Sequence, residues 1–254
     1  GQKRIILLDL FPTLFHLCLL FLIYNFCTFM ATLITTNLTM DYDSEGPVIN
    51  LLPLLNGQHS FAGANAALQP FPDGLLAFEH ALQTLHSAVP LADTIYISLQ
   101  HESQISQIQF RLDDPCPLFP SHDHADDDPE SPHRIPRLEI ISNQAGTGES
   151  RNNPLNSLLA AHAIDPDTKW LVLSCEFPLL PPPALQQLVL EYQDPVTCFV
   201  KEDGVSEPLI GIWGSEALEH LRAHVGGREN DEDVLRCAVE ELQGKLVTPL
   251  REEW

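Results

Sequence analysis

From residue 46 onward, short apolar runs alternate with segments whose apolar residues recur at helical spacing, and this order constrains the fold more than any other feature. The expected strands lie at 48–55, 94–99, 137–141, 170–175, 197–200 and 208–213. The expected helices lie at 75–89, 155–163, 183–192, 215–225 and 232–242. Strands that alternate with helices form mostly parallel sheets with helices on both faces. The sequence therefore predicts one three-layer α/β/α domain over residues 46–254.

The charge of the chain limits its partners. There are 13 basic and 35 acidic residues, which gives a formal net charge of -22. A field of this sign repels phosphate backbones, so we expect no nucleic-acid partner. A small nucleotide stays compatible with this charge, because backbone dipoles and a metal ion act locally.

The cysteines and two of the histidines have structural interpretations. The 6 Cys are scattered without a C-x-x-C pair, which favours reduced thiols over a disulfide framework or a zinc site. Cys175 is expected to be a core residue. His59 and His162 are interpreted as surface or hydrogen-bonded histidines rather than catalysts.

Residues 1–45 differ from the rest of the chain. Residues 10–34 contain no Lys, Arg, Asp or Glu and are dense in Leu, Phe and Ile. This run exceeds the roughly 20 residues that a helix needs to cross a bilayer. The basic residues before it and the acidic residues after it favour a cytosolic N-terminus. We keep two interpretations open: a single transmembrane anchor, and a gene-model artefact.

A second unusual segment interrupts the domain at residues 111–136. It is rich in Pro, Asp and His, a composition typical of loops without regular structure. We expect an exposed acidic loop there.

Ligands of mostly parallel sheets bind at the carboxyl ends of the strands. Two loops are therefore of interest: the one that follows Leu55, and the one that follows Cys175.

Four segments of the chain carry a resemblance to a known family. They are LLNGQHSFAGANAALQPF at 54–71, NPLNSL at 153–158, WLVLSCEFPLL at 170–180, and Glu207–Pro208–Leu209 with Gly211 and Trp213. In this order they resemble the molybdenum cofactor guanylyltransferases, whose segments read L-A-G-G-x-S-x-R-M-G-x-D-K-A-L-L, G-P-L-A-G-L, W-L-x-V-L-A-C-D-x-P-L-L and E-P-L-x-G-x-Y. Two of these segments bear on the chemistry, the one at 54–71 and the one at 170–180. The segment at 170–180 matches its family pattern better.

The resemblance implies a Rossmann-like nucleotidyltransferase fold and a cytoplasmic location. The reaction it implies is transfer of GMP from GTP to molybdopterin with Mg²⁺. The partners it implies are GTP or another nucleoside triphosphate, and molybdopterin. Residues 10–34 would instead imply a single-pass membrane protein if the leader is genuine.

The resemblance also implies site residues. Glu176 occupies the position of the family's metal-binding Asp and is expected to be catalytic and to hold Mg²⁺. The positions implied for nucleotide binding are Leu55, Asn56, Gly57, Gly63, Asn65, Ala66 and Asn153.

Several of these positions depart from the family pattern. Phe61 and Ala66 stand where the family has Arg and Lys, so two cations are missing. A hydrogen bond to a charged group contributes about 1.5–3 kcal/mol, so their loss weakens nucleotide binding and transfer. Asn153 and Ser157 replace glycines and are expected to crowd the nucleotide. Three functions stay open: a nucleotidyltransferase; a non-catalytic relative that binds nucleotide weakly or acts as a scaffold; and a membrane-anchored protein whose soluble domain presents an acidic surface to a partner.

Overall fold

The computed structural model describes residues 49–55, 66–99, 103–113, 118–119, 135–141, 154–224 and 231–250. The chain divides into two units, Gly1–Pro47 and Val48–Trp254, and all described residues belong to the second. The apolar run at 10–34 lies outside the described residues. Among the helices that are described, none has the length and apolar character needed to cross a bilayer.

Over the described residues, the domain is built on one sheet of seven strands in the order β3-β2-β1-β4-β6-β5-β7. The strands are β1 (Ile49–Leu55), β2 (Thr94–Leu99), β3 (Arg137–Ile141), β4 (Lys169–Ser174), β5 (Val196–Val200), β6 (Ser206–Trp213) and β7 (Lys245–Val247). Strand β6 runs antiparallel to its neighbours β4 and β5, and the remaining pairs are parallel. The chain changes direction across the sheet between β1 and β4, because β2 and β3 extend to one side before β4 pairs with the other side of β1.

The helices are η1 (Ala66–Leu68), α2 (Ala77–Ala88), α3 (Ser103–Leu112), α4 (Pro154–Ile164), α5 (Pro182–Leu190), α6 (Ser215–His224) and α7 (Asp231–Glu241). Each helix that the sequence predicts is confirmed, with small shifts at its ends. Each predicted strand is confirmed in the same way. The sequence did not predict η1, α3 or β7. The mostly parallel α/β/α architecture is confirmed.

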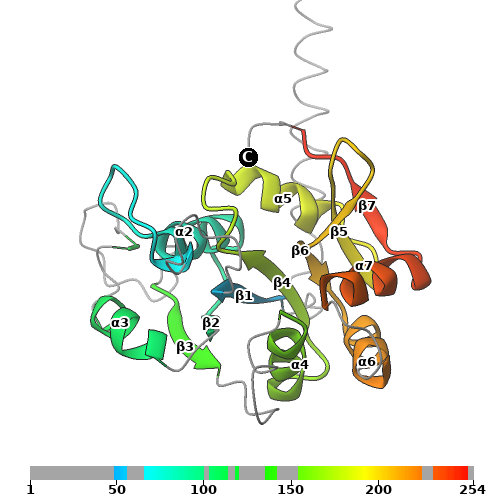
Figure 1. The fold of residues 1–254 in the computed structure, drawn as a ribbon, viewed down its shortest axis with the longest axis horizontal. Helices are drawn as coiled ribbons and strands as arrows, with labels where there is room; N and C mark the ends of the chain where they lie inside the picture. The colour runs from blue at the N-terminus through cyan, green and yellow to red at the C-terminus, as the bar shows by residue number, and fades with distance from the viewer. Residues whose placement is uncertain are drawn as a thin grey trace, which may run out of the picture. The chain divides into compact units, whose positions relative to one another are not determined.

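Both faces of the sheet are buried under helices. Helices α2 and α5 cover one face, and α4, α6 and α7 cover the other (Figure 1). Alternate residues of β4 serve the two layers: Leu171 and Leu173 lie under α2 and α5, whereas Trp170 and Val172 lie under the opposite helices. A strand buried on both faces is a nearly continuous apolar run, which explains the sequence WLVL.

The contact between β5 and β6 depends on Gly211. A Cβ atom at this position would lie 2.7 Å from the carbonyl oxygen of Thr197 and 2.8 Å from the Cβ of Cys198. The register between the two strands also shifts between Cys198 and Phe199. Gly211 therefore lets the two backbones approach closely, a packing role for a residue in one of the four resembling segments.

The predicted loop at 111–136 is shorter at its start than expected, because Arg111 and Leu112 belong to α3. It is also not wholly exposed. Leu118 and Phe119 are 3% and 7% exposed, and the side-chain amide of Gln83 in α2 donates to the carbonyl oxygen of Leu118. These two apolar residues anchor the segment to the core, which a composition argument overlooks.

Candidate functional site

The carboxyl ends of β1 and β4 lie side by side. Leu54 of β1 pairs in parallel register with Ser174 of β4, and the Cys175 N–H donates to the Leu54 carbonyl oxygen at 3.0 Å. The chain therefore leaves both strands at the same edge of the sheet. Leu55, the last residue of β1, and Glu176, in the loop that follows Cys175, lie at this edge.

Glu176 lies in a tight turn directly after β4. Its backbone N–H is 3.3 Å from the hydroxyl of the fully buried Ser174, and the Phe177 N–H donates to the Ser174 carbonyl oxygen at 3.1 Å. The residue itself is only partly buried. Farther along, the Thr84 hydroxyl of α2 donates to the Leu180 carbonyl oxygen at 3.3 Å. The turn is thus fixed at both ends while Glu176 stays accessible to solvent.

Leu55 ends β1, and its side chain is fully buried in the core. Its carbonyl oxygen lies 3.4 Å from the side-chain amide nitrogen of Gln104, the second residue of α3, which is also buried. Any contact between Leu55 and a nucleotide therefore has to come from the backbone. Gln104 was missed by the sequence argument because α3 itself was missed.

The N-terminal turn of α4 lies against the end of β2. The Ser98 hydroxyl of β2 donates to the Ser157 hydroxyl at 2.7 Å, and both residues are fully buried. The expectation that Ser157 crowds a nucleotide is wrong, because its side chain points into the protein and links α4 to the sheet. Helix α4 begins at Pro154, next to Asn153 in the sequence.

Ala66 begins η1, which leads into a short hairpin before α2. The Gln69 N–H donates to the Ala66 carbonyl oxygen, and Pro70 pairs with Leu76. Ala66 is partly buried and supplies no charge. The other predicted nucleotide-binding residues, Asn56, Gly57, Gly63, Asn65 and Asn153, lie outside the described residues, as does Phe61.

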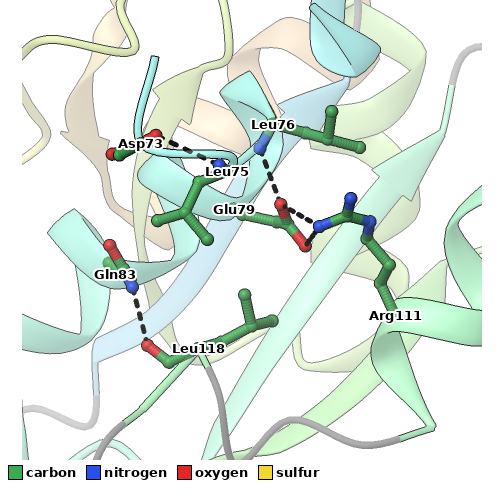
Figure 2. Close-up of polar contacts among 7 residues, drawn as sticks. All are labelled: Asp73, Leu75, Leu76, Glu79, Gln83, Arg111 and Leu118. Atoms are coloured by element: carbon green, nitrogen blue, oxygen red, sulfur yellow. Dashed lines mark hydrogen bonds and ion pairs between the residues drawn. The ribbon is translucent and has the colours of Figure 1, made fainter. Parts of the chain in front are cut away.

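An ion pair with a buried carboxylate joins α2 to α3 close to this hairpin. The Glu79 carboxylate is 1% exposed and accepts from Arg111 Nη1 at 2.8 and 2.9 Å and from the Leu76 N–H at 2.6 Å (Figure 2). It compensates an N–H at the start of α2, where a negative charge is also favoured by the helix dipole. The pair spans 32 residues of sequence, and no local pattern signals it.

The thiols of Cys175 and Cys198 are buried core groups. Cys175 is 2% exposed, which confirms the interpretation of this residue, and burial raises the pKa of its thiol, with a smaller contribution from Glu176. Burial likewise raises the pKa of Cys198 to about 12; the charge of Glu207 adds to this effect, and a hydrogen bond with the Glu207 backbone opposes it. A nucleophilic role would need a thiolate, which these surroundings disfavour.

His162 in α4 is not the surface or hydrogen-bonded histidine that was expected. It is 2% exposed, and within the described part of the chain neither ring nitrogen has a hydrogen-bond partner. Burial lowers the pKa of His162, and the charge of Arg222 in α6 lowers it further, against smaller opposite effects of Glu219 and Asp167. The folded protein therefore holds this imidazole neutral.

This burial predicts a pH-dependent stability. The unfolded chain protonates His162 near its ordinary pKa of 6.5, whereas the folded protein does so only at lower pH. The free energy of unfolding should fall as the pH drops below 6.5 toward 5, and this loss should be smaller in the His162→Leu variant. Urea unfolding of both proteins at pH 7.5, 6.0 and 5.0 measures the difference. If the free energy of unfolding falls equally with pH in the wild type and the His162→Leu variant, this prediction is wrong.

The described residues around Glu176 are compatible with a magnesium site of one kind. No group of three or more His, Cys, Asp or Glu side chains that could hold a metal is found among the residues that the structure describes. Mg²⁺, however, is commonly bound by one or two carboxylates, with water and substrate phosphates as the other ligands. Glu176, a partly buried residue at the strand ends, could supply one such carboxylate.

The fold and this edge define a class of protein. The sheet is mostly parallel, and its strand order reverses between β1 and β4, with Glu176 directly after β4. Open α/β proteins bind their ligands at such a reversal, which is called the topological switch point. A comparison with protein-family models identifies the member of this class. Residues 60–244 match the MobA-like NTP transferase domain, and the chain belongs to this family.

Solved structures of nucleotidyltransferases share the fold. A nucleotidyl transferase from Methanothermobacter thermautotroptrophicus is 14% identical, with a TM-score of 0.56 over 82% of this chain and 89% of that one. The molybdopterin-guanine dinucleotide biosynthesis protein A of Archaeoglobus fulgidus is 12% identical, with a TM-score of 0.51 over 78% of this chain and 83% of that one. The 4-diphosphocytidyl-2C-methyl-D-erythritol synthase of Anaerococcus prevotii is 10% identical, with a TM-score of 0.51 over 82% and 89%.

A search of curated proteins found no match. The Rossmann-like nucleotidyltransferase fold is confirmed by the family and the solved structures together. A nucleotidyltransferase-like function follows from the family, whereas the named proteins of this fold differ in the products that their names specify.

Proposed function

We propose that the domain binds a nucleoside triphosphate, with GTP as the first candidate, together with Mg²⁺ at the edge where β1 and β4 end. The observation that carries this proposal is the parallel pairing of Leu54 with Ser174, which brings the end of β1 and Glu176 to one edge. A nucleotide there would lie close to the carboxylate of Glu176. Bound Mg²⁺ would neutralise charge on the phosphates, and Glu176 would be its protein ligand.

The reaction we propose is transfer of a nucleotide to a phosphate acceptor, with molybdopterin as the expected acceptor. A phosphate oxygen of the acceptor attacks the α-phosphorus of the triphosphate, the new P–O bond forms, and pyrophosphate leaves. The chain's own residues contribute orientation and charge. Since Ala66 and Phe61 carry no positive charge, we expect this transfer to be slow.

Nucleotide binding without transfer is the second candidate function, and Ala66 favours it. This residue begins η1 at the position where the resemblance expects a lysine, and a methyl group cannot neutralise a phosphate. Incubation of the full chain with labelled GTP, Mg²⁺ and molybdopterin separates the two candidates. Release of labelled pyrophosphate from γ-labelled GTP supports transfer, and its absence with intact binding supports the second candidate.

Binding itself is tested by thermal unfolding of the full chain in GTP and Mg²⁺. A ligand at 100 times its dissociation constant adds about 2.7 kcal/mol to the free energy of unfolding, which is a rise of several degrees in Tm. The double variant Phe61→Arg with Ala66→Lys should bind GTP more tightly than the wild type, because it restores two cations. If neither protein is stabilised by millimolar GTP, ATP, CTP or UTP, nucleotide binding at this edge is disproved.

A further inference from the structure

We infer that α3 is the element that positions this nucleotide site, and that Gln104, Arg111 and Glu79 are its positioning residues. The inference rests on the proposed function, because it assigns a role to residues that support the proposed site without touching the nucleotide. We call the Gln104–Leu55 contact and the Arg111–Glu79 pair together the α3 tether. Nothing in the family resemblance pointed to these residues.

The first contact of the α3 tether acts at the end of β1. Gln104 is 2% exposed, and its amide nitrogen lies 3.4 Å from the carbonyl oxygen of Leu55. Leu55 is the last residue of β1, so this carbonyl is where the loop after β1 departs. A buried amide at this point holds the last carbonyl group of β1 in place, since a buried carbonyl oxygen has to find a partner.

The second contact acts on the chain that returns from η1 to α2. Arg111 donates to both carboxylate oxygens of Glu79, and that carboxylate accepts the N–H of Leu76 (Figure 2). Leu76 pairs with Pro70, and the next residue, Ala77, donates to the carbonyl oxygen of Gln69.

A continuous set of hydrogen bonds therefore runs from α3 to the start of η1. The Gln69 N–H donates to the carbonyl oxygen of Ala66, so the chain of contacts ends at the residue that stands in the family's lysine position. One helix thus contacts the end of β1 directly and reaches Ala66 through Glu79 and the hairpin.

The charges of Arg111 and Glu79 hold the second contact in one geometry. A carboxylate that is 1% exposed is strongly disfavoured unless it is paired, and Arg111 supplies the pairing charge from a side chain that is 39% exposed. Because a single Arg nitrogen bonds both carboxylate oxygens, rotation of the Glu79 carboxylate is restricted. The oxygen that accepts the Leu76 N–H is then held in place, and with it the start of α2.

The test compares Arg111→Met and Arg111→Lys with the control Arg137→Met. Arg137 is 71% exposed and pairs with Glu139 in β3, so the control removes the same kind of charge from an exposed pair. Amide hydrogen exchange is measured at Gln69, Leu76 and Ala77, and at Leu171 in the central strand as the reference. If Arg111→Met does not fold, Glu79→Gln takes its place, because it removes the charge and keeps an acceptor for Leu76.

We expect exchange at the hairpin amides to rise roughly tenfold in Arg111→Met, to rise less in Arg111→Lys, and to stay unchanged in the control. Exchange at Leu171 should change little. A uniform rise at all four amides would indicate a general loss of stability and would overturn the inference. Unchanged exchange at the hairpin would overturn it as well.

GTP affinity with Mg²⁺ is the second readout in the same proteins. We expect Arg111→Met to bind GTP at least about fivefold more weakly than the wild type, with Arg111→Lys in between. Equal affinities in a wild type that binds GTP would overturn the inference and leave the proposed function intact. A wild type that binds no nucleotide would overturn the proposed function, and the positioning role with it, whatever the exchange experiment shows about the hairpin.

Discussion

The Gly211→Ala variant should lose about 3 kcal/mol or more of its free energy of unfolding. The added Cβ would lie 2.7 Å from a backbone oxygen of Thr197 and 2.8 Å from the Cβ of Cys198. Neither atom belongs to the end of a flexible side chain, so β5 and β6 have to separate. Both strands are buried, and their separation would also loosen the packing against α5 and α7. Urea unfolding at neutral pH measures the loss.

Gly204→Ala is the matched control for this prediction. Gly204 lies in the turn that joins the same two strands, and no atom lies within 4 Å of its missing Cβ, but its φ is +82°. The cost there comes only from the left-handed backbone and should be about 1 kcal/mol. If the two variants lose equal stability, the close approach of β5 and β6 is not what requires Gly211.

Glu176→Gln should remove the Mg²⁺ dependence of GTP binding and lower any nucleotide transfer by on the order of 100-fold. An amide has nearly the same shape as the carboxylate but no charge for the metal ion. Isothermal titration with GTP, with and without Mg²⁺, measures the first effect, and pyrophosphate release measures the second. Glu176→Asp, which has the side chain of the family's position, should retain both properties.

Glu216→Gln is the control for Glu176→Gln. Glu216 is exposed in the first turn of α6, which follows the antiparallel strand β6 and so begins at the opposite edge of the sheet. Its loss changes the net charge by the same amount as Glu176→Gln. An equal effect of both variants on Mg²⁺-dependent binding would mean that global charge, and not Glu176, is responsible.

Much of the fold could be predicted because its central strands are buried on both faces. The run WLVLS has to lie inside the protein. Leu82 and Leu85 recur at helical spacing, so their side chains have to face the same core. The direction of β6 could not be predicted in the same way. An apolar strand is equally apolar in either direction, and only its pairing with β4 and β5 decides.

Helix α3 was missed for a different reason. Its polar residues conceal an apolar spacing at Ile105, Ile108 and Leu112, of which Ile108 is fully buried. That spacing was the available signal for the helix. The Arg111–Glu79 pair had no such signal, because long-range ion pairs leave no periodic trace in a sequence.

The candidate site was predictable in its location more than in its details. Strand ends of parallel sheets meet at one edge, so Leu55 and Glu176 could be brought together from the order of elements alone. The side chains of Ser157 and His162 could not be placed, because neither their burial nor their partners follow from residue type. One is hydrogen-bonded to Ser98, and the other is enclosed without a partner among the described residues.

The insertion of β6 between β4 and β5 has a consequence for synthesis on the ribosome. Strand β5 emerges before β6 and, among the described strands, pairs with β6 and β7 only, so it cannot join the sheet when it first appears. Until Trp213 has left the exit tunnel, β4, whose residues 170–173 are apolar, has no partner strand on the side where β6 pairs with it. Nascent chains that stall in this interval expose an unpaired apolar strand that is prone to aggregation. A chaperone would therefore matter most at this stage of synthesis.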